Sequence, residues 1–378
     1  MLNILIAPNA FKNSLTATAA AEAISMGLLS SKLSCTCECF PVGDGGDGTI
    51  ELLIKKLNGT SFNVTVNGPL GHRVSAPAGL INNGETALIE MADACGMRLL
   101  KHEELNPLAA TSYGTGQMIK AALDKGVRKI LIGMGGSATV DGGCGILQAL
   151  GVRFLGADGN ELTNLPEALT QLVTVDTSNL DQRIAGCGLT ILCDVDNMLL
   201  GTAGAAEIFG PQKGASPADV KTLEAALTMF AKVTLQHNGI DMAALARGGT
   251  AGGAAAGLHA YLNATLVNGI AHFLNLTHFD TALHKAGLVI TGEGSIDEQT
   301  LRGKAPFGVA ARAKLYGKPV VALAGKIPLV KSNALQNYFD VLLAVGNGPA
   351  DVQTAMAVTA QNLQRTATEA GNLLALIK

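Results

Sequence analysis

Short apolar runs, each followed by a loop and then by helical periodicity, dominate both ends of the chain. This alternation indicates strands of a parallel sheet joined by helices. Near the N-terminus it predicts strands at LNILIAP and CTCECFPV and helices over 14–30 and 49–57, with Ser14 and Thr16 as candidate caps of the first helix. Beyond residue 285 it predicts strands at AGLVITGEG, KPVVALAG and FDVLLAVG and a long C-terminal helix.

The middle of the chain departs from this rhythm. Short alternating runs, FNVTV, RVSAPAGLI and TALIEMA, are separated by NG, GPLG and NNG, which are turn signals. They predict a small antiparallel meander. The strand-and-helix rhythm returns at VRKILIG and LTILCDV, and a helix is predicted over residues 217–237.

The strand count predicts the domain organisation. Two strands before residue 60 and three after residue 285 complete a five-stranded parallel sheet of the flavodoxin-like type, with strand order 2-1-3-4-5. We therefore expect an α/β protein with a discontinuous flavodoxin-like domain, residues 1–60 plus 287–378, and an inserted α/β domain, residues 61–286. The loops after strands 1, 2 and 3 are expected to line one cleft facing the insert, because ligands bind where the strand order reverses.

Composition narrows the functional class. The hydrophobic fraction is 48%, and 46 of the 378 residues are glycine, about 12% against a usual ~7%. The net charge of −3 and the lack of long basic runs argue against nucleic acid or an anionic membrane as partner. No apolar stretch approaches the ~20 residues of a membrane span. We expect a cytoplasmic protein acting on small molecules, with a homo-oligomer left open.

The stretch VGDGGDGTIELL places two acids in a glycine-rich loop before a predicted helix. Such a loop normally invites a phosphate, which fixed negative charges would repel. One interpretation is a plain turn with capping acids. The strand count favours another, in which Asp44 faces the acceptor side of a substrate and Asp47, nearer the helix, caps it.

The loop GMGGSATVDGGCG follows the strand VRKILI and is the best candidate for phosphate binding. Its glycines, Gly135 and Gly136, let the backbone approach an anion, and Ser137 and Thr139 add hydroxyl donors. GMGGSA also fits the dinucleotide pattern G-x-G-x-x-A, and a merely tight turn is a third interpretation. No G-x-x-x-x-G-K-[ST] motif is present, which excludes a P-loop.

Further acids and bases lie in loops after predicted strands: Asp194 and Asp196 in CDVDN, Lys213 in FGPQKGAS, and Glu293, Asp297, Arg302 and Lys304 in VITGEGSIDEQTLRGK. Each residue alone could be a turn former, a cap or a solvated charge. Together, carboxylates beside cationic residues suit a magnesium-bound phosphate. The set favours phosphoryl transfer, which requires positioning, Mg²⁺ and cationic donors rather than a covalent nucleophile.

The segments APNAFKNSLTA, PVGDGGDGT, NPLAATSYGTG, GMGGSATVDGG, CDVDN, FGPQKGAS and TGEGSIDEQTLRGKAPFGVA resemble, in order and over nearly the whole chain, the bacterial type I glycerate kinases, or glycerate 2-kinases. The resemblance implies a flavodoxin-like domain with a restriction-endonuclease-like domain inserted. It also implies a kinase that uses ATP and Mg²⁺ to convert D-glycerate to 2-phosphoglycerate in organic acid metabolism.

On this resemblance the residues take specific roles. The catalytic candidates are Lys12, Asp44, Asp194 and Lys213; the nucleotide-binding candidates are Gly135, Gly136, Ser137 and Thr139; the metal candidates are Glu293 and Asp297. Asp44 or Asp194 would lie near the attacking hydroxyl. Lys12 and Lys213 would contact the transferred phosphate or the substrate carboxylate.

Four positions, Asn9, Ala10, Val140 and Ser295, depart from the family pattern, which has an acid, a hydroxyl, an amide and a guanidinium there. Asn9 cannot act as a base, and Ser295 cannot make a bidentate phosphate contact. These departures leave open a related small hydroxy-acid kinase with altered substrate, or a silent carboxylate-binding protein. A nicotinamide-dependent oxidoreductase using GMGGSA is the hypothesis from another enzyme class.

Overall fold

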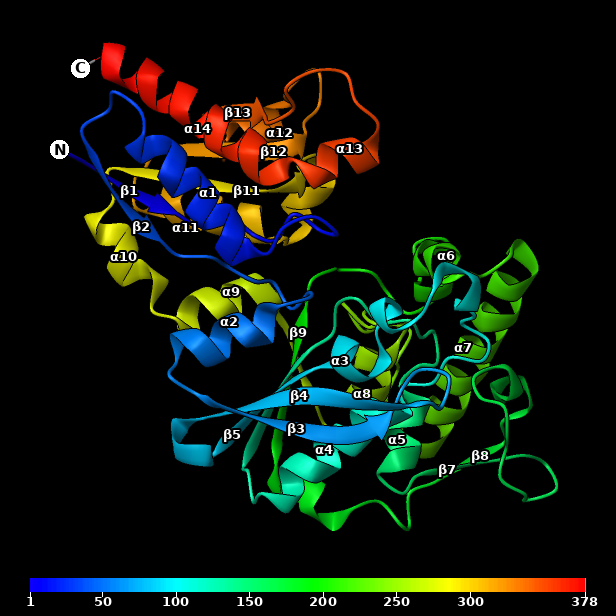
Figure 1. Cartoon of the computed structure of the whole chain (residues 1–378). Helices are drawn as coiled ribbons and strands as arrows, with labels where there is room; N and C mark the ends of the chain where they lie inside the picture. The colour runs from blue at the N-terminus through cyan, green and yellow to red at the C-terminus, as the bar shows by residue number, and fades with distance from the viewer. Residues whose placement is uncertain (378) are drawn as a thin grey trace. The chain divides into compact units, whose positions relative to one another are not determined.

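The computed structural model describes residues 1–377, and the chain divides into two compact units. The first unit comprises Met1–Asp44 and Gly269–Lys378, and the second comprises Gly45–Asn268. These boundaries lie at residues 44 and 269, whereas the sequence pattern placed them at 60 and 287. The helix after the acidic loop therefore belongs to the second unit, and two helices before residue 287 belong to the first (Figure 1).

The first unit is built on a five-stranded parallel sheet in the order β2-β1-β11-β12-β13. The predicted order 2-1-3-4-5 is confirmed. Its strands are β1 (Leu2–Ile6), β2 (Cys35–Cys39), β11 (Leu288–Ser295), β12 (Val320–Lys326) and β13 (Val341–Ala344). Its helices are α1 (Ala17–Leu29), α9 (Gly269–Leu276), α10 (Phe279–Lys285), η7 (Glu298–Arg302), α11 (Ala305–Leu315), α12 (Asn333–Gln336), α13 (Val352–Ala357) and α14 (Thr359–Leu376).

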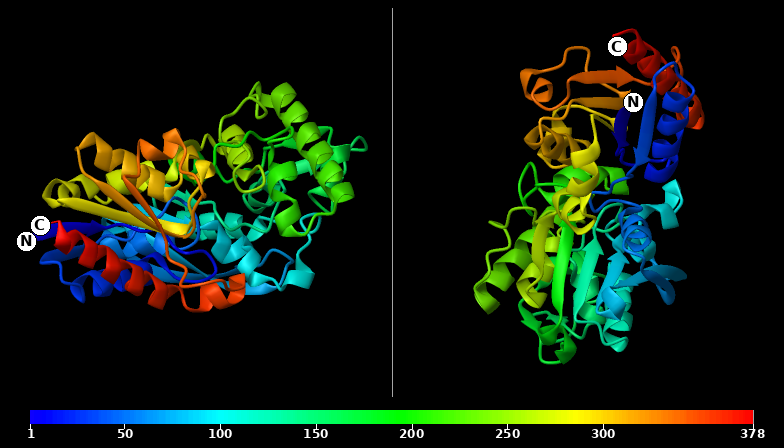
Figure 2. Two further views of the ribbon diagram at one scale, coloured as in Figure 1. Left: turned by 90° about the horizontal axis from the view of Figure 1, so that it is seen from above. Right: turned by 90° about the vertical axis from the view of Figure 1, so that its left-hand side faces the viewer.

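Helices cover both faces of this sheet. α1 and α14 pack together over the face that carries Ile4 and Ile6, and α10 and α11 pack against β1 and β11 on the other face (Figure 2). Thr16 caps α1, since its Oγ1 accepts a hydrogen bond from Ala19 N at 3.2 Å. Ser14, the other predicted cap, instead donates to the carbonyl oxygen of Met356 at 2.7 Å.

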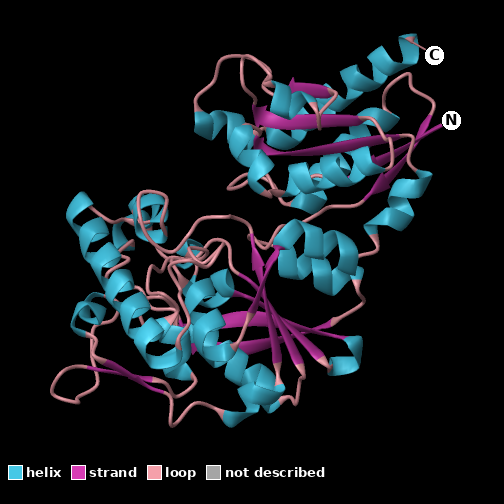
Figure 3. Cartoon of the chain, turned by 180° about the vertical axis from the view of Figure 1, so that it is seen from behind, coloured by secondary structure: helices cyan, strands magenta, loops and turns pink. Residues whose placement is uncertain are grey.

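The second unit contains a six-stranded mixed sheet in the order β10-β9-β6-β5-β4-β3 (Figure 3). β3, β4 and β5 form the predicted antiparallel meander, and β5, β6, β9 and β10 are parallel. The strands are β3 (Thr60–Asn67), β4 (Arg73–Ile81), β5 (Thr86–Glu90), β6 (Lys129–Gly133), β9 (Gly188–Cys193) and β10 (Thr265–Asn268), and a separate antiparallel pair joins β7 (Arg153–Leu155) to β8 (Thr174–Asp176).

Its main helices are α2 (Thr49–Lys56), α3 (Met91–Cys95), α4 (Tyr113–Asp124), α5 (Cys144–Ala149), α6 (Ala205–Phe209), α7 (Pro217–Asn238) and α8 (Ala254–Leu262), with a short 3-10 turn η6 (Pro211–Lys213). α2 packs on β4 and β5, while α8 packs on β9 and β10. The large apolar core runs from the sheet to α7, where Phe154 meets Phe230 edge to face. Across residues 1–377 no helix is long and apolar enough to cross a membrane.

Candidate functional site

In the first unit, the carboxylate of Asp44 is buried and accepts hydrogen bonds from other segments of the chain. Its Oδ2 accepts from Asn9 Nδ2 at 3.2 Å and from the backbone N–H of Ala305 at 3.1 Å. Asn9 follows β1, Asp44 lies beyond the end of β2, and Ala305 begins α11. Because β1 and β11 are the neighbours at which the strand order reverses, this carboxylate lies where parallel sheets bind ligands.

Glu293, near the end of β11, is the second buried acid at this edge of the sheet. Its Oε1 accepts a hydrogen bond from Thr300 Oγ1 at 3.1 Å. Burial raises the pKa of Glu293 to about 7, and Asp44 raises it further, while the ammonium of Lys304 opposes the shift. Asp44, Glu293 and Lys304 therefore form one electrostatic group, in which a cation would favour the ionised acids.

The other predicted residues of this unit have more exposed positions. Asp297 caps η7, with Oδ1 accepting from Gln299 N at 2.8 Å. Lys12 is exposed on the loop after β1. Within residues 1–377 no group of three or more His, Cys, Asp or Glu residues is arranged to hold a metal ion. A Mg²⁺ ion bound by one or two carboxylates and substrate phosphates still fits Glu293, whose buried charge lacks full compensation.

In the second unit, the glycine loop after β6 packs tightly on the chain around it. A Cβ at Gly135 would lie 2.4 Å from the Cα of Gly46, and one at Gly136, where φ is +73°, would lie 2.3 Å from Asp47 Oδ1. Only glycine fits both positions. Within residues 1–377 the N–H groups of Gly136, Ser137 and Thr139 have no protein acceptor.

Lys213 reaches this loop from η6. Its Nζ donates to Ser137 Oγ at 3.0 Å and to the carbonyl oxygen of Thr139 at 2.7 Å, and the side chain is buried. The hydroxyl of Thr139 is buried and has no hydrogen-bond partner in the described part of the chain. The structure thus brings together Lys213 and the predicted nucleotide residues, which are more than 70 positions apart in sequence.

Asp194 and Asp196 follow β9, which is the neighbour of β6 in the parallel part of the sheet. Asp196 Oδ1 lies 3.1 Å from Nε of Arg247, close enough for an ion pair, although that N–H does not point at the oxygen and makes no hydrogen bond within residues 1–377. Arg247 has a left-handed backbone, with φ at +66°. Such strain in a non-glycine residue is typical of functional sites.

Sequence reasoning missed this segment, RGGTAGG at 247–253, which precedes α8. The carbonyl oxygen of Gly252 accepts from Gly142 N at 3.0 Å, and a Cβ at Gly252 would lie 2.1 Å from the carbonyl oxygen of Thr139. The segment is therefore part of the wall of the glycine loop. Its cluster of glycines before an apolar helix was the available signal.

Asp141 is a second residue whose role the sequence did not indicate. It is buried, and its carboxylate accepts from Ser112 N at 2.9 Å, Ser112 Oγ at 2.6 Å, Gly143 N at 3.0 Å and Gly145 N at 3.3 Å. It fixes the end of the glycine loop to the start of α4. The helix α5 begins only at Cys144 and has six residues, so the tight strand-to-helix turn of a dinucleotide fold is not formed.

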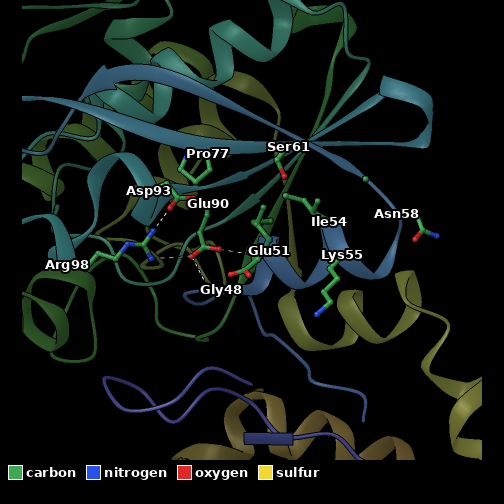
Figure 4. Close-up of a pocket in the computed structure, with 12 residues that line it drawn as sticks. Gly48, Glu51, Ile54, Lys55, Asn58, Ser61, Pro77, Glu90, Asp93 and Arg98 are labelled. Atoms are coloured by element: carbon green, nitrogen blue, oxygen red, sulfur yellow. Dashed lines mark hydrogen bonds and ion pairs between the residues drawn. The ribbon is translucent and has the colours of Figure 1, made fainter. Parts of the chain in front are cut away.

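Glu90, at the end of β5, was also missed, and it corrects the prediction that Asp47 caps α2. Gly48 directly precedes α2, and no side chain of the loop makes a capping hydrogen bond to the helix. Instead Glu90 accepts from Gly48 N at 2.7 Å and from Ile50 N at 3.2 Å (Figure 4). Asp47 Oδ1 lies 3.4 Å from Arg98 Nη1. Asp47 therefore pairs with Arg98 and does not cap the helix.

Comparisons with known proteins identify the family of the chain. The model of the glycerate kinase family matches residues 4–375. Glycerate kinase of Bacillus subtilis (strain 168) is 41% identical over 377 residues, covering 100% of this chain and 99% of that protein. Glycerate 2-kinase of Escherichia coli (strain K12) is 42% identical over 349 residues, covering 91% of this chain and 92% of that protein.

A solved structure gives the same result. The crystal structure of a protein provisionally named glycerate kinase 2, from Salmonella typhimurium LT2, is 41% identical and superposes with a TM-score of 0.81, covering 99% of this chain and 98% of that one. A kinase of this kind transfers a phosphoryl group to an alcohol, which excludes the nicotinamide-dependent oxidoreductase. The chain belongs to the glycerate kinase family and is a phosphotransferase with an alcohol group as acceptor.

Proposed function

We propose that this protein uses ATP and Mg²⁺ to phosphorylate the 2-hydroxyl group of D-glycerate, giving 2-phosphoglycerate. The observation that carries the proposal is the buried ammonium of Lys213 on the glycine loop, beside amide donors without acceptors. A cation and amide donors at one place suit a polyphosphate. The family assignment and the name of the Escherichia coli relative support the substrate and the product.

In this proposal the second unit binds the nucleotide. The phosphates lie on Gly135, Gly136, Ser137 and Thr139, and Lys213 neutralises charge on the transferred group. Asp194, directly after β9, is one of two candidates for the carboxylate near the acceptor hydroxyl. Transfer forms a bond from the hydroxyl oxygen to the γ-phosphorus and breaks the bond from that phosphorus to the β,γ-bridging oxygen of ATP.

The first unit supplies the remaining groups. Asp44 is the other candidate for the carboxylate that takes the hydroxyl proton, and Lys12 would contact the transferred phosphate or the substrate carboxylate. Glu293 and Asp297 would hold Mg²⁺ when it is bound, and this ion would supply charge neutralisation at the phosphates. Because Asp297 already caps η7, Glu293 is the better placed of the two.

Three further features remain predictions. The mixed sheet of the second unit is consistent with a restriction-endonuclease-like fold. The protein is expected in the cytoplasm, and a homo-oligomer is left open. Separately, Asn9, which donates a hydrogen bond to Asp44, is uncharged where the family pattern has an acid. This difference could alter substrate preference, so a test should include other small 2-hydroxy acids.

The test is direct. Purified protein with Mg-ATP should release ADP when D-glycerate is added, measured in parallel with the Bacillus subtilis relative under the same conditions. Phosphorus NMR of the product distinguishes the 2-phosphate from the 3-phosphate. Activity of the relative without any ADP from this protein, over D-glycerate and a panel of short 2-hydroxy acids, would overturn the proposal. Binding without turnover would instead support a silent carboxylate-binding protein.

A further inference from the structure

The segment RGGTAGG, residues 247–253, is held between the loops that follow two neighbouring parallel strands, β6 and β9. Gly249 N donates to the carbonyl oxygen of Asn197, in the loop after β9, at 3.0 Å. Gly142 N, in the glycine loop after β6, donates to the carbonyl oxygen of Gly252 at 3.0 Å. The RGGTAGG segment therefore borders the phosphate-binding candidate on one side and the acidic loop CDVDN on the other.

Arg247 begins this segment in a strained conformation. Its φ of +66° lies in the left-handed region, which costs free energy in a residue with a side chain. Its Nε lies 3.1 Å from Asp196 Oδ1. By the covalent geometry of a guanidinium, the edge formed by the two Nη groups faces away from Nε, and neither Nη has a protein acceptor within residues 1–377. This edge is a fork that can bind a planar carboxylate through two parallel hydrogen bonds.

Polar atoms without partners gather at this place. In the described part of the chain, four buried side-chain nitrogen or oxygen atoms lack a hydrogen-bond partner, and three of them belong to Arg247, Thr250 and Thr139. Thr250 lies in the RGGTAGG segment, and Thr139 lies in the glycine loop that the segment contacts. Because folded proteins satisfy nearly all buried polar groups, such a concentration of exceptions beside backbone strain is typical of a functional site.

The charge of Arg247 lies near the acid proposed for the acceptor side. Burial raises the pKa of Cys193, the last residue of β9, to about 12; the charge of Asp194 raises it further, and the charge of Arg247 lowers it. Both charged groups therefore act at the end of β9. In a 2-hydroxy acid the carboxylate is bonded to the carbon that carries the hydroxyl. A cation near the acid that meets the hydroxyl is therefore in reach of the carboxylate.

We propose that Arg247 determines the specificity for the acceptor: its two Nη groups bind the carboxylate of the small 2-hydroxy acid while Asp194 meets the hydroxyl. Asp196 is the positioning residue for this guanidinium. The inference rests on the proposed function, because it takes Asp194 as the acid on the acceptor side. Asp196 has 49% of its side chain exposed, so water weakens its repulsion of the bound carboxylate. Lys213 remains with the phosphates.

The experiment compares the intact wild type with Arg247→Gln and Arg247→Lys, using Mg-ATP as donor. The two acceptors are D-glycerate and its amide, D-glyceramide, which keeps both hydroxyls and lacks the charge. We expect Arg247→Gln to lower kcat/KM for D-glycerate by about 10–10²-fold, the effect of losing hydrogen bonds between charged groups, and to change that for the amide by less than about threefold. Arg247→Lys keeps the charge without the fork and should fall between the two.

Calorimetry separates the acceptor from the nucleotide. The Kd of D-glycerate, measured with Mg-AMP-PNP present, should rise in Arg247→Gln by the same factor as kcat/KM falls, while the Kd of Mg-AMP-PNP itself should stay unchanged. Asp196→Asn should raise KM for D-glycerate and retain kcat. The same change should have no further effect in Arg247→Gln, because a residue that acts only through another loses its effect when that residue is removed.

Arg153→Gln is the matched control. Arg153, on β7, forms an ion pair with Asp176 on β8 and has 46% of its side chain exposed, so the variant removes a paired guanidinium elsewhere in the same unit. It should keep the wild-type kcat/KM for both acceptors. Thermal unfolding shows which variants are folded. If Arg247→Gln is not, Arg247→Lys and Asp196→Asn provide the same comparison.

The outcomes separate this inference from the proposed function. Wild-type affinity for D-glycerate in folded Arg247→Gln overturns the inference and leaves the kinase proposal intact. Weaker binding of Mg-AMP-PNP with D-glycerate binding unchanged also overturns it, and would assign the guanidinium to the phosphates. A wild type that binds D-glycerate through Arg247 but forms no ADP would overturn the proposed function alone. A wild type that binds no D-glycerate would overturn both.

Discussion

The carboxamide of Asn9 donates a hydrogen bond to the carboxylate of Asp44 across 3.2 Å, at the point where the strand order of the first unit reverses. The family pattern that the sequence resembles has an acid at the position of Asn9. This protein therefore has one buried carboxylate with an amide partner where two acids would compete for protons.

The first prediction concerns this pair. Asn9→Asp would place a second carboxylate beside Asp44, and the pKa of the pair would rise because two like charges cannot easily coexist at that distance. A pKa that is higher in the folded than in the unfolded state stabilises the fold at low pH. This stabilisation is lost as pH rises through the folded pKa. The deficit in Tm relative to the wild type should therefore grow from pH 4 to pH 8. Asn9→Ser is the control, and a deficit independent of pH would contradict the expectation.

Asp44→Asn tests the catalytic role of this acid. We expect turnover to fall by about 10²-fold or more, the usual contribution of a general base. Because the hydrogen bonds from Asn9 Nδ2 and Ala305 N would go to a neutral oxygen instead of a charged one, the variant should also lose about 1 kcal/mol of stability. Initial rates and thermal unfolding measure the two effects. The control is Asp351→Asn, which alters an exposed helix cap far along the chain. Near-wild-type turnover in Asp44→Asn would remove Asp44 from the mechanism.

Lys213→Met separates charge from packing. Methionine has a similar length, so the buried stem remains filled while the ammonium on Ser137 and Thr139 is removed. We expect kcat to fall by about 10²–10³-fold, as when one preorganised charge donor is lost. Tm should fall only moderately, because the stem stays filled while the hydroxyl of Ser137 and the carbonyl oxygen of Thr139 lose a donor. Lys221→Met, at an exposed position on α7, is the matched control. A lysine that served only structure would give the opposite pattern, with low Tm and retained kcat.

The stability of the protein should decrease from acid to neutral pH. Burial raises the pKa of Glu90 from 4.5 to about 7 and that of Asp93 from 3.8 to about 6. Stability conferred by the protonated acids is complete below their unfolded pKa values and is lost as pH rises through the folded ones. Glu90 alone accounts for about 3 kcal/mol, at ~1.36 kcal/mol per pKa unit.

Urea unfolding of the wild type and of Glu90→Gln from pH 4.5 to pH 8 checks this expectation. The wild type should lose stability relative to the variant as pH rises, because only the wild type must bury a charge. Curves that stay parallel over the whole range would show that Glu90 does not titrate differently in the folded and unfolded states.

The local pattern of apolar runs was sufficient to predict the strands and strand order of the sheet in the first unit. Its strands are short apolar runs with parallel neighbours, and handedness and connection rules leave few orders for five of them. The domain boundaries were less accessible, because α2, α9 and α10 are amphipathic helices whose sequence does not say which unit they pack on. Asp47 shows the same limit: it looks like a cap from its spacing, yet Arg98, fifty-one residues away, attracts its side chain.

The sequence by itself determined the family, the parallel sheet, the meander and the chemical character of the loops, since these follow from periodicity, turn residues and motifs. Only the tertiary structure showed that Lys213 contacts Ser137 and Thr139, that Asp141 fixes the glycine loop, and that Glu90 caps α2 from β5. A hydrogen bond between residues far apart in sequence depends on the three-dimensional placement of the elements that carry them. No local pattern of hydrophobic and polar positions encodes that placement.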